Sequence, residues 1–106
     1  YNSYDAENER YILEVKSRDK KYRGWAIERK KFDSNILKSV EKRKMFVYLT
    51  EYNGNIMTWN IHNLVRKGYD FQWSKIPMPQ TTDFTNNKVI VKEIGFLYEG
   101  KAKIHT

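Results

Sequence analysis

The chain has no cysteine, few prolines and glycines, and no long hydrophobic run. Its 106 residues include 0 cysteines, 2 prolines and 5 glycines, so disulfides and thiolate metal sites are excluded. The longest run of aliphatic and aromatic residues is Met45–Leu49, far shorter than the ~20 residues that span a bilayer. We therefore expect no membrane partner. The phosphate-binding motifs G-x-x-x-x-G-K and G-x-G-x-x-G are also absent from the sequence.

The length indicates one domain, which we divide into a core over residues 1–60 and an extension over residues 61–106. The first residue is tyrosine rather than methionine, so we expect a missing upstream segment. The bias toward lysine, asparagine and tyrosine is typical of an AT-rich genome. Together with the lack of cysteine and of a secretory segment, it favours the cytoplasm of a bacterium or of a phage-infected host cell.

Acidic residues are too few to balance the basic ones. There are 20 lysines and arginines against 13 acids, a net charge of +7. The excess is densest over residues 16–31, where only two acids accompany Lys16, Arg18, Lys20, Lys21, Arg23, Arg29, Lys30 and Lys31. Such a cluster attracts a polyanion, nucleic acid first. The alternative is a loop whose charge serves only solubility.

Hydrophobic periodicity predicts an α+β fold in which helices pack on a mixed central sheet. The expected strands cover residues 1–6, 10–17, 25–29, 45–51, 55–60, 70–73, 89–94 and 96–98. The expected helices cover residues 33–43 and 61–67.

Turn and capping residues predict where these elements begin and end. Asn53-Gly54 indicates a hairpin, because a type I′ turn needs positive φ at both central residues. Asn60 is expected to cap the short helix, which Gly68 ends. Asp33 or Ser34 is expected to cap the long helix.

The long helix is expected to turn Ile36, Leu37 and Val40 toward the core, with Phe32 packed on Leu37 as a hydrophobic staple. Further along, Pro77-Met78-Pro79 is expected to break a strand.

The strand over residues 10–17 carries two charged side chains where an amphipathic strand would be apolar. Glu14 and Lys16 share a face because strand residues alternate. If residues 1–6 pair with this strand through a two-residue loop, Asp5 joins that face. A loop at residues 8–9 makes Asp5 a diagonal neighbour of Glu14, and a loop at residues 9–10 places it directly opposite.

Two close carboxylates repel each other unless a divalent cation lies between them. Asp5 and Glu14 are therefore candidate ligands for Mg²⁺ or Mn²⁺, with the carbonyl of Val15 as a further ligand. Lys16 beside them could stabilise developing negative charge or help to orient and deprotonate an attacking water. Basic side chains around the site would hold phosphates: Arg18, Lys20, Lys21, Arg23, Lys30 and Lys31.

Asp5, eight intervening residues and then Glu14-Val15-Lys16 resemble the signature of the PD-(D/E)XK nuclease superfamily. The segments YILEVKSR, WAIE, KKFDSN and MFVYL follow the order of most of its αβββαβ core. Tyr4 stands where the signature has proline, and the superfamily's first helix has no counterpart. The resemblance implies a restriction-endonuclease-like core and Mg²⁺-dependent endonucleolytic cleavage of DNA, often by a homodimer.

Other polar residues have more than one interpretation. Glu28 is expected on the strand next to Glu14, where it is either an additional ligand or support for the site, or the ion-pair partner of a neighbouring lysine. Ser17 extends the motif strand and is a candidate contact to the substrate backbone. His62 and His105 lack metal-ligand spacing and are expected to be surface or partly packed residues, and no serine has an obvious histidine partner.

Three functions remain open from the sequence. The first is the metal-dependent nuclease. The second is a non-catalytic nucleic-acid-binding module that uses the same basic face, and the third is a protein-interaction domain. Against a catalytic site stands a simpler arrangement, in which Glu14 and Lys16 form an exposed cross-strand pair on a solvent-facing sheet.

Overall fold

The computed structural model describes residues 4–17, 25–79 and 89–105, which form two β-sheets and two α-helices. In chain order the elements are β1 (Ala6–Glu7), β2 (Tyr11–Ser17), β3 (Trp25–Glu28), α1 (Arg29–Lys42), β4 (Met45–Tyr52), β5 (Asn55–Asn60), α2 (Ile61–Arg66), β6 (Ser74–Pro79), β7 (Val89–Leu97), the 3₁₀-helix η1 (Glu99–Lys101) and β8 (Lys103–His105). The fold is α+β with a mixed sheet, as the sequence predicts.

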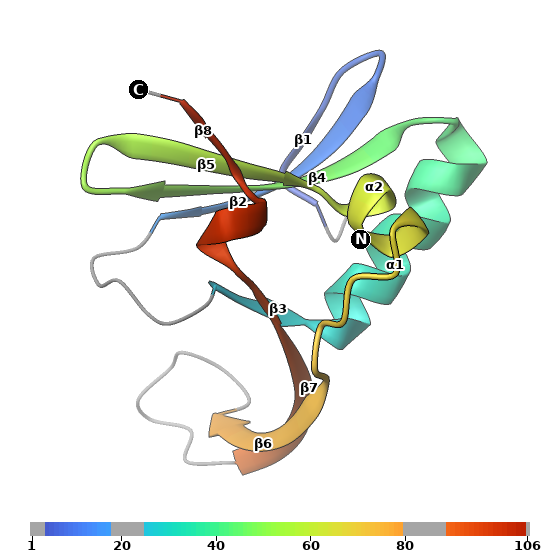
Figure 1. Ribbon diagram of the computed structural model, residues 1–106. Helices are drawn as coiled ribbons and strands as arrows, with labels where there is room; N and C mark the ends of the chain where they lie inside the picture. Colours follow the sequence, from blue (N-terminus) through green and yellow to red (C-terminus); the bar gives the residue numbers. More distant parts are fainter. Residues whose placement is uncertain (1–3, 18–24, 80–88, 106) are drawn as a thin grey trace.

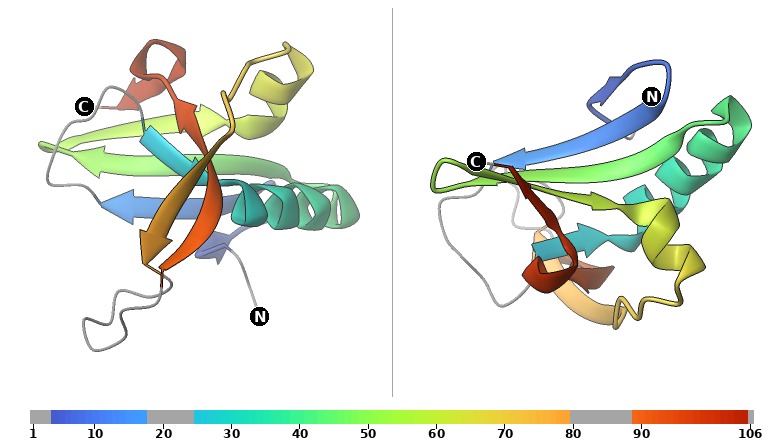
Figure 2. Two further views of the ribbon diagram at one scale, coloured as in Figure 1. Left: turned by 90° about the horizontal axis from the view of Figure 1, so that it is seen from below. Right: turned by 45° about the horizontal axis from the view of Figure 1, so that its top comes forward.

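The larger sheet has the strand order β1-β2-β4-β5-β8, and the smaller one has the order β3-β7-β6 (Figure 1). Among the described strands only β2 and β4 run parallel to each other, and parallel neighbours need a crossover connection. Here the chain crosses over through β3 and α1. Both crossover elements lie on the same side of the larger sheet, together with the smaller sheet (Figure 2).

The core lies between the two sheets and α1. Its largest fully buried side chains include Trp25, Phe46, Tyr48 and Trp59. Burying each such aromatic side chain stabilises the fold by roughly 1.5–3 kcal/mol. The cluster also contains Ile61, Leu64, Phe71 and Leu97, so residues of the 61–106 segment belong to the same core as the first 60.

The predicted hairpin and the predicted helix cap are confirmed. Asn53 and Gly54 both have positive φ, 51° and 77°, and they join β4 to β5. The side chain of Asn60 accepts a hydrogen bond from the backbone N–H of Asn63 and so caps α2. Gly68, with φ of 78°, follows the end of that helix.

The predicted start of the long helix is wrong, because α1 begins four residues earlier, at Arg29, with Glu28 as its N-cap residue. The predicted apolar stripe is right only for Ile36, which packs against the core, because Leu37 and Val40 are 60% and 63% exposed. The helix buries Asn35 and Ser39 instead, so small polar residues that find partners form part of the packed face.

The predicted staple is therefore also wrong. Phe32 lies inside α1 and packs edge-on against Phe71 and Trp73, with ring centroids 5.0 and 5.2 Å away. An aromatic partner contributed by a segment about forty residues later along the chain replaces the local contact with Leu37.

Strand boundaries differ from the prediction in several places, and β8 (Lys103–His105) is not among the expected strands. The first strand is limited to Ala6–Glu7, whereas the expected range ended at residue 6. The expected strand over residues 70–73 is irregular, and the Pro77–Pro79 segment forms part of β6 rather than breaking a strand. Proline is tolerated there because β6 is an edge strand of its sheet.

Gly95 lets an aromatic ring lie directly on β7, which runs without a break where the sequence suggests a bend. A Cβ at this position would lie 2.8 Å from ring carbons of Trp73 and 3.0 Å from the Cβ of Phe71. The Trp73 ring has little freedom to retreat, because it stacks on Phe71 with centroids 5.3 Å apart and lies 5.2 Å from the guanidinium of Arg29.

The described part of the chain contains no helix that is both long and apolar enough to cross a lipid bilayer.

Gly95→Ala is expected to lower the free energy of unfolding by about 1–3 kcal/mol, the usual cost of overpacking a core. Urea denaturation followed by tryptophan fluorescence would measure the change. Gly100→Ala is the matched control, since a Cβ there meets nothing within 4 Å. Equal stability of the two variants would contradict a tight contact between Trp73 and β7.

Candidate active site

Glu14 lies on the inner face of the larger sheet, where its side chain is only 3% exposed. In the parallel register it is aligned with Tyr48, two residues beyond the aligned pair Ile12 and Phe46, and all three of those residues are buried. The alternative of an exposed Glu14–Lys16 pair on a solvent-facing sheet is therefore wrong. The charged pair faces the core, α1 and β3.

The Oε2 atom of Glu14 is buried and has no hydrogen-bond partner among the described residues. The same holds for the hydroxyl of Thr50, which is fully buried and aligned with Lys16 on the neighbouring strand β4. Leaving a buried polar group unpaired costs about 1–3 kcal/mol. Two such groups on one face, on adjacent strands, indicate a place for a polar ligand, a water or a cation.

Asp5 directly precedes β1 and lies beside β2, the strand that carries Glu14. Strands β1 and β2 pair in the register Ala6–Leu13, and the N–H of Asn8 donates to the carbonyl of Tyr11 across the turn. Residues 9–10 therefore form the loop. Of the registers left open by the sequence, this is the one that puts Asp5 opposite Glu14.

The carboxylate of Asp5 is fixed by the backbone of β2. Its Oδ2 accepts a hydrogen bond of 2.7 Å from the N–H of Val15, and its own N–H donates to the carbonyl of Leu13 at 2.8 Å. The side chain is exposed, so its other oxygen is accessible to a ligand.

The carbonyl of Val15 points toward the same edge of β2. In a strand the N–H and C=O of one residue point the same way. Because the N–H of Val15 bonds to Asp5 rather than to β4, its carbonyl also faces away from β4. The three predicted metal ligands, Asp5, Glu14 and Val15, are thus contributed by one short stretch of the hairpin.

A network of hydrogen bonds holds the hairpin in place. Glu7 on β1 accepts bonds from Lys44 at 2.6 Å and from Lys42 at 2.9 Å, and from the hydroxyl of Tyr4 at 2.9 Å. These bonds from Lys44, Lys42 and Tyr4 lower the pKa of Glu7 to about 2. They join β1 to the end of α1 and so position Asp5, two residues earlier.

Burial raises the pKa of Glu14, and four charged neighbours act on it as well. Lys16 and Lys31 favour its ionised form, whereas Asp5 and Glu28 oppose it. Four of the other charged groups predicted for the site or its rim are therefore close enough to Glu14 to interact with it electrostatically.

Glu28 occupies a different place from the one expected. It is on β3, which pairs with β7 in the smaller sheet, so the prediction of a strand beside Glu14 is wrong and Glu28 approaches from the facing layer. It lies 3.7 Å from the ammonium of Lys92. Glu28 therefore has the expected lysine partner, and its role as an additional ligand or support for the site stays a prediction.

The basic residues are only partly described. Lys31, in the first turn of α1, is half-buried, and Lys30 beside it is exposed. Ser17 ends β2. The remaining predicted phosphate contacts lie outside the described residues: Arg18, Lys20, Lys21 and Arg23.

A metal ion at this site would need few protein ligands. No group of three or more histidine, aspartate and glutamate side chains suited to a metal occurs among the described residues. Two carboxylates and one backbone carbonyl fit Mg²⁺, which keeps several waters and often takes substrate phosphate oxygens as ligands. The same set is a poor fit to Zn²⁺, which prefers histidine and cysteine.

His62 packs against Ser39 in a way that excludes a serine nucleophile. Its Nδ1 accepts from the N–H of Phe46 at 2.9 Å, so Nε2, 3.0 Å from the Ser39 hydroxyl, carries the proton and donates it. That hydroxyl in turn donates to the carbonyl of Ile36. Burial lowers the pKa of His62 and keeps the ring neutral, so the prediction of a partly packed histidine is confirmed.

Two residues near the site escape sequence reasoning. Thr50 is placed by the parallel pairing of β2 with β4, and Lys92 by the pairing of β3 with β7. No local pattern in the chain signals either pairing.

A comparison of the chain with protein-family models, with curated proteins and with solved structures found no significant match.

Glu14→Gln is expected to stabilise the protein at pH 7–8. Because the folded-state pKa of Glu14 lies above the ordinary value of 4.5, the native state binds more protons than the unfolded state between those two values. Wild-type stability therefore falls as pH rises from 4.5 through the folded pKa, and the variant should lack this loss. Urea denaturation from pH 4 to pH 8 would measure it.

The expected gain at pH 8 is about 1 kcal/mol or more, with little difference at pH 4. Glu51→Gln is the control, since Glu51 is an exposed acid on the adjacent strand β4. If the free energy of unfolding changed with pH in the same way for wild type and Glu14→Gln, burial of the ionised Glu14 carboxylate would not destabilise the fold.

Proposed function

We propose that this protein is a Mg²⁺-dependent endonuclease that hydrolyses phosphodiester bonds in DNA, as the resemblance to the PD-(D/E)XK superfamily implies. The observation that carries the proposal is the buried, unpaired carboxylate oxygen of Glu14, close to Asp5 and Lys16. An apolar side chain at this position would make the fold more stable than the buried Glu14 carboxylate does. The presence of the carboxylate therefore indicates a functional role.

The exposed oxygen of Asp5, the buried and unpaired Oε2 of Glu14 and the carbonyl of Val15 would hold the metal. When bound, Mg²⁺ supplies polarisation of the phosphodiester and a more acidic water. It would also compensate the repulsion between the two carboxylates, which otherwise adds to the cost of burying Glu14.

Lys16 acts on the reacting groups from the same face of β2. Hydrolysis joins a water oxygen to phosphorus while the bond from phosphorus to the leaving oxygen breaks, and the water proton lost on attack is balanced by one gained at the leaving group. The ammonium of Lys16 stabilises the additional negative charge on the phosphoryl oxygens and helps to orient the water. Lys31, contributed by α1, adds a second positive charge.

The DNA backbone would contact basic residues of α1 and of the chain segment that follows β2 in the sequence. Lys30 and Lys31 on α1 and the side chains of Arg18, Lys20, Lys21 and Arg23 are the proposed phosphate contacts. The same proposal includes action as a homodimer and a location in the cytoplasm of a bacterial or phage-infected cell.

A second function is favoured by a specific observation. One oxygen of Asp5 is already occupied by the N–H of Val15, while the net charge of +7 suffices for phosphate binding without any metal. The alternative is therefore a non-catalytic nucleic-acid-binding module that uses the same basic face.

Cleavage assays would separate the two functions. Supercoiled plasmid, linear duplex, single-stranded and four-way-junction DNA would be incubated with Mg²⁺, with Mn²⁺ and with EDTA. The nuclease predicts cutting that requires metal and falls by at least about 100-fold in Asp5→Asn, Glu14→Gln and Lys16→Met, with Glu51→Gln as the active control. Salt-dependent binding without cutting in either metal would favour the binding module.

Metal binding gives an independent readout. Ca²⁺ or Mg²⁺ should raise the melting temperature of the wild-type protein, since a ligand at 100 times its Kd stabilises by about 2.7 kcal/mol. Glu14→Gln should lose most of this shift and Glu51→Gln should keep it. An identical shift in both variants would place the metal elsewhere.

A further inference from the structure

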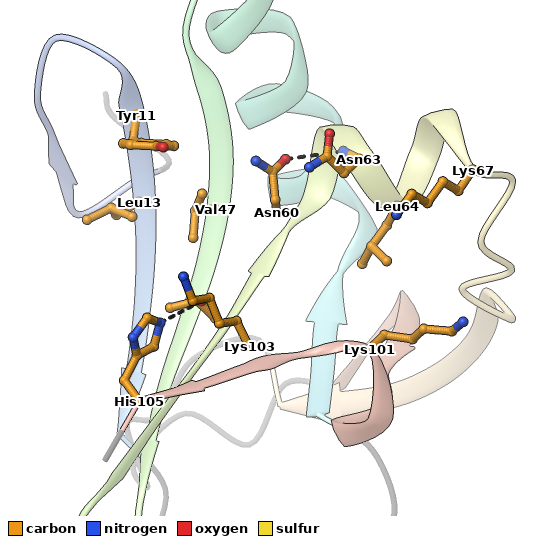
Figure 3. A pocket seen from close by; sticks show the side chains of 11 residues that line it. Tyr11, Leu13, Val47, Asn60, Asn63, Leu64, Lys67, Lys101, Lys103 and His105 are labelled. Carbon is orange, nitrogen blue, oxygen red and sulfur yellow. Dashed lines mark hydrogen bonds between the residues drawn. The ribbon is translucent and has the colours of Figure 1, made fainter.

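The outer face of the larger sheet carries a hollow of about 530 Å³, on the side opposite Glu14. Its floor is formed by Tyr11, Leu13 and Val47, which alternate with the inward-facing Ile12, Glu14 and Phe46. The short helix α2 closes one side and β8 another (Figure 3). The volume is within the range of small-molecule sites.

The charge of this hollow is entirely positive. Lys67 from the end of α2, Lys101 from η1 and Lys103 from β8 line it at separate positions (Figure 3), and no aspartate or glutamate of the described residues lines it. Among the described residues, none of these three lysines has a carboxylate within ion-pair distance, whereas Lys42, Lys44 and Lys92 elsewhere all have one. Three unneutralised ammonium groups around one hollow attract an anion with several charges or acceptor oxygens.

The uncharged polar groups of the hollow are also arranged as donors. The Oδ1 of Asn60 is occupied by the N–H of Asn63, and the Oδ1 of Asn63 accepts from Arg66. Their side-chain NH₂ groups can donate to a ligand in the hollow, which both residues line. Such a surface matches the acceptor oxygens of a phosphate and the ring nitrogens and carbonyls of a base.

The floor is apolar and adjoins an aromatic ring. Leu13 and Val47 are paired across β2 and β4, and Tyr11 is the next residue of β2 on the same face. A planar, partly apolar ring would bury this surface and could stack on the tyrosine. An inorganic anion would leave the floor uncovered.

We infer that this hollow binds a nucleotide, whose phosphate is attracted by the positive charge of Lys67, Lys101 and Lys103 and whose base lies against the apolar floor. The nucleotide is either free in solution or the phosphorylated end of a DNA strand. The inference does not depend on the proposed nuclease, because the two sites use opposite faces of the sheet and have no lining residue in common.

Nuclear magnetic resonance titration of the 12.8 kDa protein in EDTA would test this inference. The probes are adenosine 5′-monophosphate, adenosine, pyrophosphate, and a single-stranded octanucleotide with and without a 5′-phosphate. Adenosine 5′-monophosphate or the 5′-phosphorylated octanucleotide should shift the backbone amides of Thr58, Asn60 and Asn63. Adenosine and the unphosphorylated octanucleotide should bind at least tenfold more weakly.

Three variants assign the contacts. Lys101→Gln combined with Lys103→Gln should raise the Kd at least tenfold, whereas Lys75→Gln, which removes an exposed lysine on β6, should change it less than twofold. Tyr11→Ala should weaken binding of the nucleotide and leave pyrophosphate unaffected. Comparison of the free nucleotide with the phosphorylated strand identifies the source of the ligand.

Equal loss of affinity in Lys75→Gln and in the double variant, or amide shifts confined to other parts of the chain, would overturn the site. Pyrophosphate binding as tightly as the nucleotide would overturn the role of the apolar floor. Glu14→Gln should bind the nucleotide normally, so that failure here and failure of the proposed nuclease remain distinguishable.

Discussion

The parallel pairing of β2 with β4 is the constraint on which the candidate site depends. Parallel neighbours cannot be joined by a tight turn, so the chain has to cross one face of the sheet before it returns. That crossing brings β3 and α1 over the face that carries Glu14 and Lys16. It buries Glu14 and delivers Glu28 and Lys31 from elements that would otherwise be distant.

The burial that creates this site also opposes stability. A carboxylate without a partner for one oxygen and a threonine hydroxyl without a partner are each unfavourable in a core. The rest of the core compensates with large aromatic side chains, several of them in edge-on contact. Mild local destabilisation at functional groups inside an otherwise consistent core is typical of binding and catalytic sites.

Several local features follow from the sequence because they depend on neighbouring residues only. The Asn53-Gly54 turn, the Asn60 cap and the alternating faces of β2 need no tertiary information, and all three are confirmed. The proximity of Asp5 to Glu14 is almost as predictable, because it depends only on which two residues form the loop of the hairpin.

The remaining features depend on contacts that the local pattern does not encode. Asn35 and Ser39 replace Leu37 and Val40 on the packed face of α1, and the partner that makes this possible for Ser39 is His62, on a later helix. Glu28 belongs to the facing sheet because β3 pairs with β7, which lies more than sixty residues further along the chain. The prolines of β6 are compatible with a strand only because that strand is at an edge.

The short strand β1 leaves part of the edge of β2 unpaired among the described residues. In the described part of the chain β1 pairs with β2 only as far as Leu13, which leaves the following residues of β2 as an open edge. Open edges invite strand addition from another molecule. The Asp5 carboxylate accepts from the Val15 N–H at that edge and adds a negative charge there, so the residue proposed to bind metal also disfavours the addition of a strand from another molecule.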